Sequence, residues 1–131
     1  MNPKQFLQIG GGVLVLVGIL GFVGILGPMP GDSIFGSAWY FDNAENWAHL
    51  VLGVVALLLA FVAPANIQKI VTVVVGVVGV LVGLYSAVGS TMLWGANLEN
   101  PADTALHLVV GAWALWAGIK KSAAAALPAT V

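Results

Sequence analysis

Cysteine is absent from this chain of 131 residues, and charged side chains make up only 7% of it. Without cysteine the chain has no disulfide, no thiolate nucleophile and no zinc–thiolate or iron–sulfur site. A soluble domain usually carries about 25% charged residues, so this chain has too few to cover a surface that faces water. Its formal net charge of -1 gives no electrostatic reason to expect a nucleic acid as a partner.

Apolar residues dominate what is present, at 60% of the chain with a mean hydropathy of +1.04. A helix that crosses a bilayer needs roughly 20 mostly apolar residues. Two long uncharged stretches meet this requirement, and two shorter ones reach it if each begins with a capped turn. The predicted spans are residues 6–27, 47–63, 70–93 and 104–119. Continuous apolar runs favour helices over a membrane barrel, whose strands alternate.

The two signs of charge are separated along the chain. All lysines fall at the N-terminus, between the second and third spans, or at the C-terminus: Lys4, Lys69, Lys120 and Lys121. All acids fall in or beside the other two connections: Asp32, Asp42, Glu45, Glu99 and Asp103. By the positive-inside rule, both termini are cytoplasmic. A secretory signal peptide is the alternative interpretation of the first span, but its length and its later counterpart favour a helix.

The chain contains an internal repeat, and the later counterpart of the first span belongs to it. When the sequence is aligned with itself at an offset of 58 residues, its two halves match without a gap. Residues 45–57 fall on residues 103–115, so the two histidines of the chain, His49 and His107, superimpose. Repeat one covers about residues 6–63, repeat two about 64–121, and residues 122–131 form a cytoplasmic tail. We therefore predict a single all-α membrane domain, a four-transmembrane-helix bundle built from two parallel tandem helical hairpins with a pseudo-two-fold axis.

The second helix of each hairpin has a predicted start. Asp42 aligns with Asn100, and each is followed three residues later by an acid. This spacing predicts a capping box in both copies, with Pro101 at the first helical position of the later one.

Below each predicted cap, residues four apart share one helix face. Glu45, His49 and Gly53 form one such stripe, and Asp103, His107 and Gly111 form its twin. The acid, Glu45 or Asp103, can hydrogen-bond one ring nitrogen of its histidine and fix the tautomer of the ring. The glycine leaves space beside the ring for a neighbouring helix or for a flat ligand.

Two interpretations follow for this motif. In the first, each histidine bonds a backbone carbonyl or a hydroxyl group of the paired helix, and glycines allow close helix contact: Gly18, Gly21, Gly24, Gly27, Gly53, Gly76, Gly79, Gly83 and Gly111. In the second, His49 and His107 bind a haem b iron from both sides. We predict that the chain has no catalytic residue, no metal and no cofactor. Haem b is the alternative to the absence of a cofactor. A divalent-metal site that adds the two acids is a further alternative.

With its repeated acid-x3-His-Leu-Val-x-Gly signature and four short helices, the chain resembles small bacterial four-helix integral membrane proteins of unknown function, and the likeness covers most of residues 6–119. This resemblance implies a multi-pass protein of the prokaryotic plasma (inner) membrane and implies no activity.

The remaining expectations concern function. Apart from the two histidines, no ionisable group lies in the central part of a predicted span, which argues against a pump or a voltage-gated channel. No nucleophile is paired with a base, so we do not expect an enzyme. We predict a structural, accessory or assembly role through helix packing, as a homo-oligomer or as a subunit of a membrane complex. The alternatives are a bis-histidine haem b electron-transfer protein near the outer face, and a carrier of a lipid or small molecule.

Overall fold

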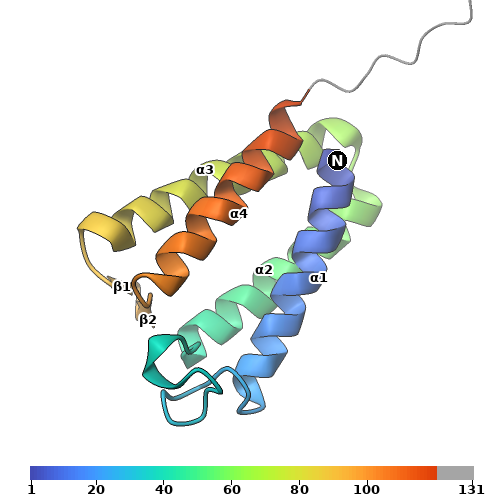
Figure 1. Ribbon diagram of the computed structural model, residues 1–131. Helices are drawn as coiled ribbons and strands as arrows, with labels where there is room; N and C mark the ends of the chain where they lie inside the picture. The colour runs from blue at the N-terminus through green and yellow to red at the C-terminus, as the bar shows by residue number, and fades with distance from the viewer. Residues whose placement is uncertain (121–131) are drawn as a thin grey trace, which may run out of the picture.

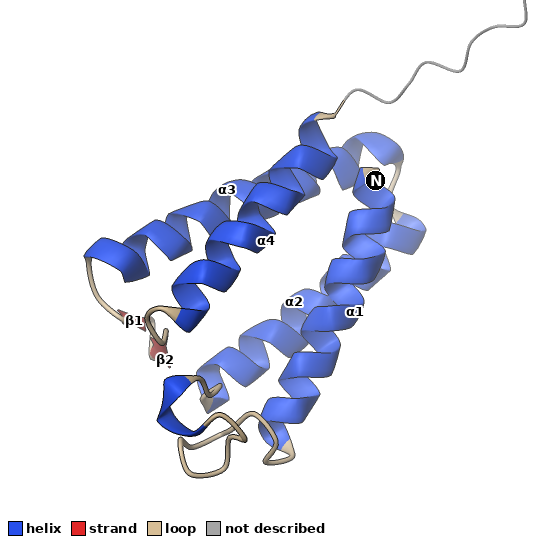
Figure 2. Ribbon diagram, viewed as in Figure 1, coloured by secondary structure: helices blue, strands red, loops and turns tan. Residues whose placement is uncertain are grey.

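The computed structural model describes residues 1–120 and consists mainly of four long helices (Figures 1 and 2). These are α1 (Pro3–Phe22), α2 (Asn43–Val62), α3 (Ala65–Val88) and α4 (Ala102–Ile119). All four are long and apolar enough to cross a membrane, which confirms the prediction of four such helices. Lys121 and the predicted tail at residues 122–131 lie outside the described residues.

The first helix occupies a different part of its apolar stretch from the one predicted. It begins at Pro3 because the Asn2 side chain accepts from the backbone N–H of Gln5 while the Gln5 side chain accepts from Asn2, a capping box. It ends at Phe22, and Gly24 follows with a φ of 81°. Glycine adopts this left-handed conformation without steric cost, so the predicted end at residue 27 is wrong.

The third helix also differs from its apolar stretch. It begins directly after Pro64 and ends at Val88, with Gly89 as its C-cap. The apolar residues beyond it form a small antiparallel hairpin of β1 (Met92–Leu93) and β2 (Ala96–Asn97). The two residues of its turn have φ values of 49° and 89°, the positive values that a type I′ turn requires.

Two pairs of helices account for most of the packing (Figure 1): α1 with α2, the first helix pair, and α3 with α4, the second. A Cβ atom at Gly53 would lie 2.7 Å from the backbone nitrogen of Val15 on α1. A Cβ atom at Gly111 would lie 2.6 Å from the backbone nitrogen of Val80 on α3. Each pair thus brings two backbones together at a position that has room for glycine alone.

The other predicted packing glycines of the helices also face the second helix of their own pair: Gly18, Gly21, Gly76, Gly79 and Gly83. Gly24 and Gly27 do not, because both follow the end of α1. Gly27 instead lies against the backbone carbonyl of Phe41 in the connection between α1 and α2. The expectation that these two glycines mark helix contacts is therefore wrong.

The two helix pairs join at one end of the molecule through an apolar core. We call this the terminal end, because it holds the N-terminus, the turn between α2 and α3, and the end of α4 (Figure 1). The rings of Phe6 and Trp113 meet edge to face with centroids 4.7 Å apart. Buried Leu7, Ala60 and Ala114 belong to the same core, so it draws residues from both pairs.

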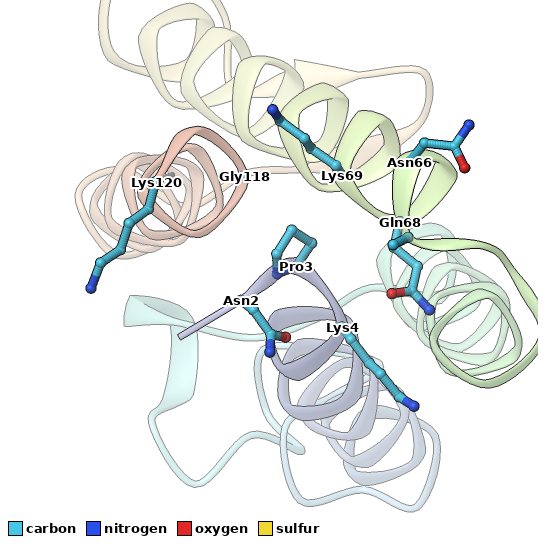
Figure 3. A pocket seen from close by; sticks show the side chains of 9 residues that line it. Asn2, Pro3, Lys4, Asn66, Gln68, Lys69, Gly118 and Lys120 are labelled. Carbon is cyan, nitrogen blue, oxygen red and sulfur yellow. The ribbon is translucent and has the colours of Figure 1, made fainter. Parts of the chain in front are cut away.

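A pocket of about 480 Å³ also opens at the terminal end, and three lysines are among its lining residues (Figure 3). The side chains of Lys4, Lys69 and Lys120 point away from one another (Figure 3), and the Lys120 ammonium lies 4.8 Å from the ring centre of Trp116. Gln68, also in the lining, donates hydrogen bonds to carbonyls at the end of α2. The pocket therefore has basic residues at its rim without a point at which their charges converge.

Candidate functional site

The opposite end, which we call the loop end, contains the predicted acid–histidine motifs and both helix starts. Asp42 caps α2, and its side chain and that of Glu45 form the predicted capping box. The matching prediction for α4 is wrong, because Pro101 is the N-cap and no side chain caps it. Asn100 donates instead to the Ser86 carbonyl at the end of α3. The Asp103 carboxylate accepts from the backbone N–H of Glu99.

Both histidines make the same local hydrogen bond. Nδ1 of His49 donates to the backbone carbonyl of Glu45 at 2.7 Å, and Nδ1 of His107 donates to that of Asp103 at 2.8 Å. The expected contact to the acid side chain is replaced, because the carbonyl one turn earlier is within reach and the carboxylates bond elsewhere. Since a carbonyl only accepts, the proton of the neutral ring lies on Nδ1 and leaves a lone pair on Nε2.

Protein packs against the His49 ring and against the glycines of both motifs. Phe41 stacks on His49 with ring centroids 4.8 Å apart and planes inclined by 20°. One turn further along each helix, Gly53 and Gly111 lie against the backbone of the neighbouring helix. The room that these glycines provide is therefore used for helix packing within each pair.

Above the histidines, three carboxylates from both helix pairs come together. Glu45 lies at the start of α2, Asp103 at the start of α4, and Glu99 in the connection before α4. Each offers an oxygen, and these three oxygens lie within 4.8 Å of one another. All three side chains are buried, with exposed fractions of 2%, 1% and 8% for Glu45, Asp103 and Glu99. We call these residues the carboxylate cluster.

Hydrogen bonds across the two helix pairs hold the surroundings of the cluster in place. The Trp39 indole donates to Asp103 at 2.9 Å, over a sequence separation of 64 residues. The backbone N–H of Asn97 in β2 donates to Asp42 at 2.7 Å, and its side chain donates to the Tyr40 hydroxyl and to Glu99. The long connection before α2 and the small β-hairpin thus close over the loop end together.

Not every polar atom of the cluster is satisfied by these bonds. Oε1 of Glu45 and Oε2 of Glu99 are buried and have no hydrogen-bond partner in the described part of the chain. Burial, together with the neighbouring carboxylate of Asp103, raises the pKa of Glu99 to about 8. The lysines that the structure describes line the pocket at the terminal end instead. The loop end therefore buries three carboxyl groups, and no lysine of residues 1–120 lies there to compensate their charge when they ionise.

The sequence pattern indicates His49, His107, Glu45 and Asp103, but it does not single out Glu99, Trp39 and Asn97 as members of this site. Glu99 is distinguished in the sequence only as one of the acids in or beside the two connections that contain no lysine. The restriction of all five acids to two connections was the signal that could have found the cluster, because those two connections meet when the helix pairs join.

Comparison with known proteins finds no matching family model, no matching curated protein and no matching solved structure. The fold defines a class: a four-helix protein whose helices suit a multi-pass membrane protein, with a polar cluster at one end.

Proposed function

We propose that the chain is a structural or accessory protein of the prokaryotic plasma membrane, which packs against a second copy or against a larger membrane complex. In this proposal the two helix pairs are tandem hairpins inserted in the same direction, with both termini cytoplasmic. The three described lysines at the terminal end and the carboxylate cluster at the loop end support this orientation.

The observation that carries the proposal is a face of α2 without a helix neighbour. The opposite face packs on α1 through Gly53, whereas α2 has almost no contact with α3 or α4. The exposed face carries Val51, Val55 and Leu58, at the spacing of one helical stripe. A helix in a closed four-helix bundle packs against two neighbours, whereas α2 packs mainly against α1. The stripe is therefore available to a helix from another chain.

Absence of cysteine makes this proposal simple to test by disulfide crosslinking, because one introduced thiol is the only thiol. We expect Val55→Cys to form a covalent dimer when native membranes are oxidised. Val78→Cys on α3 is the matched control, equally an exposed valine, and we expect it to remain monomeric.

The contrary result is equally clear. If Val55→Cys gives no dimer, and if the wild-type chain runs as a monomer without co-purifying protein in several mild detergents, the proposal fails.

The Nδ1 hydrogen bonds of the two histidines support a second candidate, a bis-histidine haem b protein. A metal-binding histidine usually donates its other ring N–H to a carbonyl or a carboxylate, as both histidines do here. If haem binds, the protein purified from haem-supplemented cells shows a Soret band that His49→Ala and His107→Ala each abolish. A wild-type spectrum without this band excludes the candidate.

A further inference from the structure

We propose that the carboxylate cluster of Glu45, Glu99 and Asp103 binds one divalent hard cation, with Ca²⁺ as the best fit, and that this ion joins the two helix pairs at the loop end. Glu45 belongs to the first pair, while Glu99 and Asp103 belong to the second. A cation between them would link two units that otherwise meet here through hydrogen bonds of loop residues.

The donor atoms favour this class of ion. All three candidate ligands are carboxylate oxygens, which Ca²⁺, Mg²⁺ and Mn²⁺ prefer, and the chain has no cysteine thiolate. The three oxygens lie within 4.8 Å of one another, close enough to converge on one ion. Ca²⁺ accepts about six to eight oxygen ligands in a flexible geometry, whereas Mg²⁺ demands a near-ideal octahedron, so this irregular set suits Ca²⁺ better.

The unpartnered oxygens are the independent evidence for a ligand. A buried carboxylate oxygen without a hydrogen bond is costly, and this site contains two, on side chains that are at least nine-tenths buried. Both belong to the residues whose oxygens converge. A cation bound between them would satisfy both atoms and would also offset the mutual repulsion of three close carboxylates.

Protons are the competing way to neutralise this cluster. The acidic and polar groups that face it include Asp42 from α2's cap, Trp39 and Tyr40 from the preceding connection, and Asn97 from β2. None of these carries a positive charge, so cluster neutrality needs either a proton or a bound cation. If a cation neutralises the cluster, the stability of the chain depends on the metal concentration at constant pH. If a proton does so, the stability does not respond to the metal.

The experiment measures the thermal unfolding midpoint of the full chain in detergent or nanodiscs, with EDTA or with CaCl₂, MgCl₂ or MnCl₂ at constant ionic strength and near-neutral pH. We expect Ca²⁺ to raise the midpoint of the wild type, and isothermal titration to show one site per chain. Glu99→Gln should weaken Ca²⁺ binding by about tenfold or more, since the ligand charge count sets the affinity of such sites. Asp32→Asn is the matched control, because Asp32 is an exposed acid of the same end.

A second signature separates this proposal from simple damage to the fold. In EDTA, Glu99→Gln should be at least as stable as the wild type, because it removes a buried carboxyl group that must take up a proton when no cation is bound, while it loses the Ca²⁺ response. Glu45→Gln should also lose the Ca²⁺ response, although this change alters the cap of α2 as well. An unchanged wild-type midpoint with all three cations overturns the proposal, as does a Ca²⁺ response that Glu99→Gln retains in full.

Discussion

Gly53→Ala is expected to destabilise the first helix pair by about 1–3 kcal/mol, the usual cost of overpacking a tight contact. The added Cβ would lie 2.7 Å from the nitrogen of Val15 and 2.8 Å from the carbonyl oxygen of Gly11. Both atoms belong to the backbone, so no side-chain rotation relieves the contact and α1 must move away from α2. Gly111→Ala should have a similar effect on the second pair, where Val80 and Gly76 stand in the same relation.

Gly12→Ala is the matched control for this experiment. Gly12 is the neighbour of Gly11 in α1, but it is exposed and a Cβ there meets nothing within 4 Å. Alanine is favoured over glycine inside a helix by roughly 0.5–1 kcal/mol, so the same chemical change should have no cost here. Unfolding in mixed SDS micelles, followed by circular dichroism, measures all three variants. Equal loss in Gly12→Ala and Gly53→Ala would contradict the backbone-contact explanation.

Stability in EDTA is expected to fall as the pH rises from about 4.5 to about 8, the interval between the ordinary pKa of Glu99 and its raised value. Burial and the adjacent Asp103 raise this pKa, so within the interval the folded chain holds a proton that the unfolded chain has lost. When the folded state binds more protons, the free energy of unfolding decreases with increasing pH. The effect is complete once Glu99 has ionised in the folded chain.

Glu99→Gln removes one titrating carboxyl group of the cluster and should make the profile less steep over this interval. Asp32→Asn should leave the wild-type profile in place, because that acid is exposed and lies outside the cluster. The midpoint of SDS unfolding at several pH values, with EDTA throughout, provides the measurement. A wild-type profile that rises with pH over this interval would contradict the assignment of a raised pKa to Glu99.

The sequence predicts the helices of this protein well, because the apolar stretches are long and few other structures accommodate them. Helix ends are predicted less well, since local chemistry determines them. Asn2 and Gln5 start α1 ahead of the apolar run, and Gly89 ends α3 while apolar residues still follow. Hydropathy records the apolar residues of a segment, and it does not record which of them the backbone includes in a helix.

The site was predicted in part, and the reason is the range of the contacts. Sequence spacing places His49 and His107 one turn after Glu45 and Asp103, but each ring bonds the backbone carbonyl of its own helix in place of the predicted carboxylate or the paired helix. The meeting of Glu45 with Glu99 depends on how two helix pairs join, and no local pattern encodes it. The hydrogen bond from Trp39 to Asp103 is of the same kind, because it joins residues 64 positions apart.

The internal packing of each helix pair has a consequence for biogenesis. Every close glycine contact of α1 is made with α2, which follows it in the chain. Since synthesis proceeds from the N-terminus, the first pair can assemble while α3 is still being made, and it needs no residue of the second pair to close its glycine contacts. Joining the two pairs is then a separate, later step, and it is at that step that the acids of the two connections first meet.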